Sequence, residues 1–452
     1  MKHLVLTIGI VGILPLSFIL RASPYLRDKF WFLIGVFPFV FPVFQFLDVE
    51  IVTGDMIWVG HVSGLLISAI DLMAIALYLT VRQKVNCIRY HFPFLLYLFA
   101  ISLSVFQAEV PFAAIFYVWQ FLRMYFFTIV IAKACTDERV PERLLKGLAI
   151  GLGIQFIAVL WQKFGLFVLQ PTGTFVHQNT LGLITSLVAF PHFALLMAGQ
   201  RQLKSAAAPF MSFVISCLIA SRAALGFAVI GFAITFFIST VRQWTNWKAL
   251  IGAAGIVAAA ALAPTAYSSL ERRFARAPLM EHEYDERAAF NRAALSMLSA
   301  NPLGIGVNHY SYVGKNYGYS VRAGVAPNEG NLDSIVHNAY WLHAAEAGYL
   351  GLVAFIVLMF YPLWISWKYS WIARHDVKGD LLIGLGAGML VIYIHSAFEY
   401  VIVVKEVQYI LSIIVGITFG LAHQIAQADK ARRTGFFAHA RSWPRNAGHL
   451  LH

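Results

Sequence analysis

The sequence predicts an all-α, polytopic integral membrane protein with about 12–13 transmembrane helices. Of its 452 residues, 59% are hydrophobic and only 12% are charged, whereas a soluble domain carries about 25% charged residues. Apolar runs long enough to cross a bilayer recur along almost the whole chain, and the mean hydropathy is +0.70. This composition excludes a soluble enzyme, a disordered protein and a disulfide-stapled secreted domain. Helices are expected because each one satisfies its own backbone hydrogen bonds in lipid.

The apolar segments follow one another at roughly 3–20, 29–47, 63–81, 92–106, 110–132, 144–162, 181–199, 206–220, 223–241, 248–263, 339–367, 380–398 and 405–425. Only Ser221-Arg222 separates the eighth from the ninth. The second contains Pro38 and Pro42, which either kink it or make it re-entrant. The chain is therefore divided into a bundle of ten spans (1–263), a large loop with short helices (264–336), three last spans (337–425) and a basic tail (426–452).

Lysine and arginine gather in alternate connections between the segments, which assigns those connections and the tail to the cytoplasm. Outside the large loop, the opposite side holds only Lys2, Lys163, Arg222 and Lys405. The large loop thus faces away from the cytoplasm. The net charge of +12 mostly reports this orientation, and we expect no nucleic-acid partner.

Two polar clusters on the outer side flank spans. The turn Pro171–Gly182 contains His177 and Asn179, which are either solvated groups of a capped turn or the rim of an outward-facing site. Arg222 lies between two apolar segments, where an arginine either snorkels to lipid headgroups or binds an anion. Arg123 lies midway along the fifth segment and invites the same question, or it instead pairs with a buried carboxylate.

Two further clusters lie in the large loop and at its exit. Residues 281–298 have apolar residues at helical spacing, which predicts an amphipathic helix that ends at Asn301-Pro302. Its Arg287 and Arg292 are either exposed charges or ligands. At the loop exit, His337 can act as a general base, with Asp333 as the carboxylate that orients it, or it is a cap or core residue.

The order of four short motifs, all on one side of the membrane, carries a resemblance. These are Gly-Thr-Phe-Val-His-Gln-Asn ending at Asn179, Ser-Arg at 221–222, Asn-Pro-Leu-Gly-Ile-Gly at 301–306 and His-Asn-Ala-Tyr at 337–340. Together with the large loop before the last three spans, they resemble the bacterial O-antigen ligase and O-antigen (exopolysaccharide) polymerase superfamily. The resemblance covers residues from about 150 to 365.

This resemblance implies a metal-independent, cofactor-free glycosyltransferase that uses undecaprenyl-diphosphate-linked glycan at the periplasmic face of the inner membrane. It implies that His337 is the catalytic residue and that Arg222 and Arg287 hold the lipid diphosphate, with Arg292 able to exchange roles with Arg287. His177, Asn179 and Asn338 are further candidates for substrate binding. No metal-binding residues are expected.

The acceptor decides which reaction the protein performs. The turn at 173–179 looks most like exopolysaccharide polymerases, which favours transfer to another lipid-linked glycan. A ligase that transfers glycan to lipid A-core and an enzyme that glycosylates protein are the alternatives. A lipid-linked oligosaccharide transporter and a subunit of a secretion complex are rivals from other classes. Further expected partners are membrane lipids and proteins of polysaccharide export or chain-length control.

Overall fold

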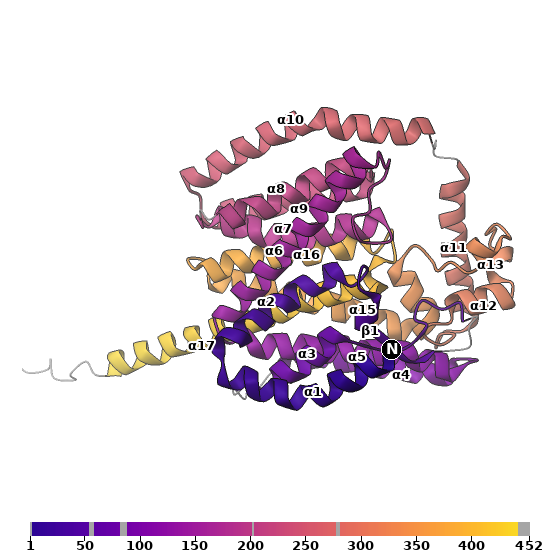
Figure 1. Cartoon of the computed structure of the whole chain (residues 1–452), viewed down its shortest axis with the longest axis horizontal. Coiled ribbons are helices and arrows are strands. Elements are labelled where there is room, and N and C mark those ends of the chain that lie inside the picture. Colours follow the sequence, from indigo (N-terminus) through magenta and orange to yellow (C-terminus); the bar gives the residue numbers. More distant parts are fainter. Residues whose placement is uncertain (1, 54–57, 82–87, 201–202, 277–280, 442–452) are drawn as a thin grey trace, which may run out of the picture.

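The computed structural model describes residues 2–53, 58–81, 88–200, 203–276 and 281–441. Long helices run side by side, with short helices clustered at one end of the bundle, here called the loop end (Figure 1). The last helix projects from the opposite end, and the N-terminus lies at the loop end (Figure 1). The α-helices and strands are, in chain order, α1 (Lys2–Ala22), α2 (Pro24–Val40), β1 (Asp48–Thr53), β2 (Gly64–Ser68), α3 (Ala69–Tyr78), α4 (Ile88–Ser104), α5 (Pro111–Ala134), α6 (Arg139–Leu160), α7 (Gln178–Met197), α8 (Leu203–Leu218), α9 (Arg222–Arg242), α10 (Asn246–Arg276), α11 (Glu281–Ala300), α12 (Tyr310–Asn316), α13 (Tyr319–Arg322), α14 (Glu329–Leu332), α15 (Ala339–Ile372), α16 (Val377–His395) and α17 (Lys405–Arg441).

The helical, multi-pass architecture is confirmed. Each predicted apolar segment overlaps one helix. Within the described ranges, nine helices are long and apolar enough to cross a membrane, and shorter apolar helices lie at Leu6–Ala22, Ala69–Tyr78 and Ser205–Leu218. The chain is therefore a multi-pass membrane protein.

The prediction that residues 63–81 form a membrane-spanning helix is wrong. Its first part is strand β2, which pairs antiparallel with β1, so α3 has only 10 residues. At 1.5 Å per residue such a helix spans about 15 Å, half the hydrocarbon thickness. The last residue of β2, Ser68, is fully buried, as are Ile70 and Leu77 of α3, whereas Ile51 and Val52 of β1 are exposed.

The predicted boundary at residue 263 is also corrected. Helix α10 continues through Pro264 to Arg276, so the loop begins later than expected. Proline is tolerated inside membrane helices, where neighbouring groups satisfy the freed carbonyl. Helix α10 lies at the edge of the bundle (Figure 1), which leaves most of its apolar surface exposed. Helix α17 similarly continues past residue 426 to Arg441, so the start of the predicted tail is helical.

The core is built around α7, which packs against α8, α9 and α16. Two of its polar side chains form hydrogen bonds within the helix: Thr185 and Ser186 donate to the carbonyl oxygen of Gly182 at 2.9 and 3.0 Å. Helices α2 and α6 touch where Gly35 meets Gly147. A Cβ atom on Gly147 would lie 2.1 Å from the carbonyl oxygen of Phe32, so this close approach requires small residues.

The Gly304-Ile-Gly306 motif packs on a break in α15. The helix is interrupted at Gly348, which has φ 69°. Ile305 and Gly306 donate their backbone N–H groups to the carbonyls of Ala345 and Glu346, both at 3.0 Å. The loop thus satisfies carbonyl groups that the broken helix leaves open. This contact anchors the large loop on the transmembrane bundle.

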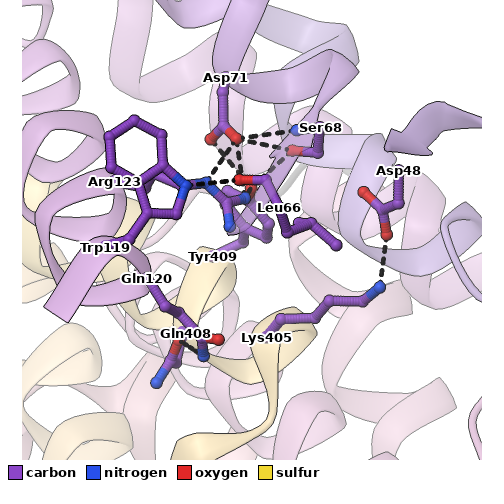
Figure 2. A network of polar contacts seen from close by, with 10 residues as sticks. All are labelled: Asp48, Leu66, Ser68, Asp71, Trp119, Gln120, Arg123, Lys405, Gln408 and Tyr409. Carbon is purple, nitrogen blue, oxygen red and sulfur yellow. Dashed lines mark hydrogen bonds and ion pairs between the residues drawn. The ribbon is translucent and has the colours of Figure 1, made fainter. Parts of the chain in front are cut away.

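A buried ion pair with Asp71 is the alternative that the structure shows for Arg123. Its Nε donates to Oδ2 of Asp71 at 2.8 Å, and Tyr409 donates to Oδ1 of the same carboxylate at 2.9 Å. Ser68 donates to Asp71 through its backbone N–H and its hydroxyl, at 3.0 and 3.1 Å. Figure 2 shows these groups pointing toward one another between the β-hairpin, α5 and α17. We call these four residues the Arg123 network; it ties the hairpin to the bundle.

Candidate functional site

A cavity of about 280 Å³ opens at the loop end of the bundle. Five parts of the chain meet there: the start of α7, the end of α10, helix α11, the entry to α15 and the connection from α16 to α17. The lining residues are His177, Gln178, Asn179, Thr180, Arg273, Glu286, Arg287, Phe290, His337, Glu399, Tyr400 and Val401. Most of them are polar, at the end of a bundle whose interior is apolar.

Glu399 is the residue that joins these segments. Its Oε2 lies 3.0 Å from Nδ1 of His337, and its Oε1 accepts from Nη2 of Arg287 at 2.9 Å. Asn179 donates its side-chain amide to the same Oε1 at 3.0 Å. The carboxylate is 7% exposed. Three of the residues singled out by the sequence therefore converge on one buried acid, and we call these four residues the Glu399 network.

The contact with Glu399 determines how the His337 ring is used. An ionised carboxylate only accepts hydrogen bonds, so Nδ1 of His337 is the donor. Nε2 then remains as the nitrogen that can take a proton. The ring lies 5.2 Å from that of Tyr400 and 5.9 Å from that of Phe290, between centroids. Its side chain is 28% exposed, so the imidazole is held in place and remains accessible.

The charges around Glu399 keep it ionised. Burial by itself raises the pKa of this carboxyl group, but the hydrogen bond from His337 and the neighbouring charges, among them that of Arg287, have the larger effect and lower the pKa below its usual value. Arg287 is 48% exposed, although one of its nitrogens is committed to Glu399. Its guanidinium therefore has further N–H donors to offer to an anion in the cavity.

The turn before α7 shapes the cavity from the opposite side. His177 is the N-cap of α7, and its Nδ1 accepts from the backbone N–H of Asn179 at 3.1 Å. Burial lowers the pKa of His177, and Arg273 and Arg287 lower it further against the opposing effect of Glu399. Asn179 also accepts from the Ser221 hydroxyl at 2.8 Å. The turn thus couples Glu399 to the start of α9.

Arg222 and Asn338 lie next to the cavity lining without being part of it. Arg222 is the first residue of α9, and its guanidinium lies 4.8 Å from the ring centroid of Phe274 on α10. It follows Ser221, which donates to Asn179, so the start of α9 lies next to the network. Asn338 caps α15: its Oδ1 accepts from the backbone N–H groups of Tyr340 and Trp341 at 3.0 and 3.1 Å.

Two expectations for the loop are not met by the geometry. Arg292 donates from Nε and Nη2 to the carbonyl oxygen of Ala323, at 3.2 and 2.9 Å, and is not among the residues that line the cavity. Asp333, the carboxylate expected to orient His337, pairs with Lys315 at 2.8 Å. The two arginines are five positions apart on α11, so they point to different sides of the helix. Arg287 is the loop arginine that faces the cavity.

Glu399, Arg273 and Glu286 also line the cavity, although no sequence motif singles them out. Glu399 follows directly after the predicted span 380–398, and an acidic residue at the outer end of a span was a usable signal. Nothing in the sequence pairs it with His337, 62 residues earlier. Arg273 was assigned to the loop because the predicted tenth span ended at residue 263. It lies near the end of α10 and donates to the carbonyl oxygen of Ala220 at 2.8 Å.

Comparison with known proteins gives one family. No curated protein matches the chain. Residues 207–356 match the model of the family described as O-antigen ligase. The matched segment runs from α8 into α15 and includes Arg222, Arg287 and His337, while His177 and Glu399 lie outside it. The match supports glycosyltransferase activity of the O-antigen ligase or polymerase type. The match over residues 207–356 confirms the similarity to the O-antigen ligase and polymerase superfamily that the motifs predict.

Proposed function

We propose that the protein uses this cavity to transfer a glycan from undecaprenyl diphosphate to a hydroxyl group of an acceptor sugar. Nε2 of His337 takes the proton of the acceptor hydroxyl as its oxygen attacks the anomeric carbon. The bond from that carbon to the phosphate oxygen breaks, and undecaprenyl diphosphate leaves with the bonding electron pair. Attack from the face opposite the leaving group inverts the anomeric centre.

The contact between His337 and Glu399, inside a polar cavity, is the observation that carries this proposal. A buried carboxylate on Nδ1 fixes the tautomer of the imidazole and stabilises the imidazolium that forms when Nε2 accepts a proton. A histidine that served only as a helix cap needs no such partner. Here the capping is done by the neighbouring Asn338, so His337 remains available for chemistry.

The arginines provide the positive charge that the leaving group requires. Arg287 and Arg273 line the cavity, and Arg222 lies at the adjoining start of α9. Guanidinium groups bind phosphate oxygens in pairs and stabilise the charge that develops on a departing diphosphate. We therefore propose that the reaction needs no divalent metal, and that these residues hold the donor headgroup while its lipid tail stays in the bilayer.

We place this reaction at the periplasmic face of the bacterial inner membrane, in line with the distribution of basic residues. The acceptor that we favour is another lipid-linked glycan, which makes the protein an exopolysaccharide or O-antigen polymerase. A ligase would use the same cavity with lipid A-core as acceptor. Supplying purified protein with lipid-linked donor alone separates the two, because only a polymerase then lengthens the glycan.

Replacing His337 with Ala tests the proposal. We expect transfer to fall by about 10²–10⁴-fold when a general base is lost, measured as glycan length on purified protein with lipid-linked donor. His375→Ala is the matched control, because His375 is exposed in the connection before α16. Near-normal transfer by a stably inserted His337→Ala protein would sink the mechanism. A loss of activity in EDTA that added divalent metal restores would contradict the metal-free reaction.

A further inference from the structure

A second group of outward-facing residues lies apart from the cavity. Trp58 precedes β2, Glu109 precedes α5, and Tyr312 and Tyr317 belong to α12 and its end. None of the four lines the 280 Å³ cavity. Glu109 is exposed, Tyr317 is 54% exposed, and Trp58 and Tyr312 are partly exposed. We call these four residues the aromatic platform.

The platform combines stacked rings with one shared carboxylate. The rings of Trp58 and Tyr312 are stacked, with centroids 5.2 Å apart and an angle of 24° between their planes. Tyr312 donates its hydroxyl to Oε1 of Glu109 at 3.2 Å, and Tyr317 donates to Oε2 at 2.8 Å. Both phenol groups are thereby oriented by an acid that still faces solvent and retains further acceptor positions.

Buried polar residues hold the three segments of the platform together. Asn308 bonds to both the N–H and the carbonyl of Val62, at 2.9 and 2.8 Å, and donates to the carbonyl of Ala113 at 3.0 Å. The backbone N–H of Val110 donates to Nε2 of His309 at 3.1 Å. Both Asn308 and His309 are fully buried. The platform is therefore fixed before any ligand binds, which lowers the entropic cost of binding.

The platform is connected to the cavity through the loop. Tyr310, the first residue of α12, donates its hydroxyl to the carbonyl oxygen of Phe290 at 2.8 Å, and Phe290 lines the cavity. A chain of sugar units attached at the cavity can extend along the loop toward the platform. Lys315, the nearest cation on α12, is already paired with Asp333. The charge that the platform presents to solvent is therefore the negative charge of Glu109.

We propose that the aromatic platform binds uncharged sugar units of the glycan; this rests on the proposed function, because the glycan is the one handled in the cavity. Aromatic rings take up the apolar C–H face of a sugar ring, while the sugar hydroxyls donate to the Glu109 carboxylate, an acceptor stronger than a neutral oxygen. An acidic sugar is disfavoured, because its carboxylate would lie beside Glu109. The platform thereby selects neutral glycans.

Saturation-transfer NMR on the full chain in nanodiscs tests this assignment, with glucose hexaose and galactose tetraose as neutral probes and galacturonate hexaose as the acidic probe. We expect saturation of the ring C–H protons of a neutral probe and none of the acidic probe. Tyr317→Ala and Glu109→Gln should each weaken binding about fivefold. Tyr349→Ala is the matched control, since Tyr349 is 57% exposed on α15 and should bind as the wild type does.

Absence of saturation for both neutral probes, or unchanged binding by Tyr317→Ala, would overturn the platform. Equal binding of the acidic probe would overturn the role of Glu109. Transfer by wild type and His337→Ala, measured on the same preparations, separates this failure from failure of the proposed function. If His337→Ala loses transfer but the wild type binds no neutral sugar, only the platform is contradicted. If the wild type binds neutral sugar but His337→Ala transfers normally, the proposed chemistry is contradicted.

Discussion

The Arg123 network and the Glu399 network each place an arginine on a carboxylate and differ in how much of the cationic groups they leave exposed. In the Arg123 network, the side chains of Arg123 and Asp71 are 6% and 11% exposed, and Asp71 accepts from an arginine, a tyrosine and a serine (Figure 2). In the Glu399 network, the side chain of the acid is only 7% exposed, but Arg287 is 48% and His337 is 28% exposed.

This difference shows how a charge in a membrane protein can be assigned a role. A fully enclosed pair serves the fold, because both charges are compensated and no ligand can reach them. A buried acid whose basic partners are partly exposed holds those partners where a ligand from solvent can reach them. Arg123 therefore anchors the β-hairpin against α5 and α17, while Glu399 holds His337 and Arg287 toward a cavity.

The largest effect is expected from opening the enclosed network. Arg123→Ala leaves Asp71 buried without its cation, and we expect the free energy of unfolding to fall by about 3–5 kcal/mol. Arg139→Ala should cost less than about 1 kcal/mol, because its contact with Asp137 is exposed. SDS titration followed by circular dichroism measures both. Equal losses in the two variants would mean that the Arg123 network does not anchor the fold.

Glu399→Gln should affect activity more than folding. Glutamine keeps the size of the side chain but removes the charge that orients and stabilises the His337 imidazole, so we expect kcat for glycan transfer to fall about a hundredfold. Asp333→Asn is the control, because Asp333 pairs with Lys315 and lies four positions before His337. Loss of transfer in Asp333→Asn with normal transfer in Glu399→Gln would reverse the assignment of the orienting carboxylate.

The two arginines of α11 are expected to differ. Arg287→Ala removes a charged donor from the cavity, worth about 2 kcal/mol, so kcat/KM for the lipid-linked donor should fall about thirtyfold. Arg292→Ala breaks only contacts to the carbonyl of Ala323 and should leave kcat/KM close to that of the wild type. Steady-state kinetics on both proteins decides which arginine serves the donor, and a larger loss in Arg292→Ala would exclude Arg287 from that role.

The smallest effect is a dependence of stability on pH. The pKa of Glu399 in the folded protein is lowered, so its contribution to stability is present above the usual glutamate pKa and is lost as the pH falls through the lower, folded value. The melting temperature of the wild type should exceed that of Glu399→Gln at pH 7, and the gap should close in acid. Glu142→Gln, at an exposed pair with Lys146, should show a small gap throughout. A gap that widens in acid would contradict the lowered pKa.

The sequence by itself determined the membrane class, the approximate position of most long helices and the presence of polar motifs at the ends of the apolar segments, because hydropathy and charge are local properties. It also indicated His337, Arg287 and Asn179. It could not separate Arg287 from Arg292, because that depends on the direction in which each side chain leaves α11. Strand β2 lies inside the apolar run at 63–81, and hydrophobicity alone does not separate a buried strand from a helix.

Only the tertiary structure decided that Glu399, and not Asp333, holds His337. The choice depends on the connection between α16 and α17 packing beside the entry to α15, where the backbone N–H of Ala339 donates to the carbonyl of Ser396 at 2.8 Å. No pattern within either segment encodes that approach. A polar residue can be recognised in the sequence because the residues around it are apolar. Its partner is decided by how the helices pack.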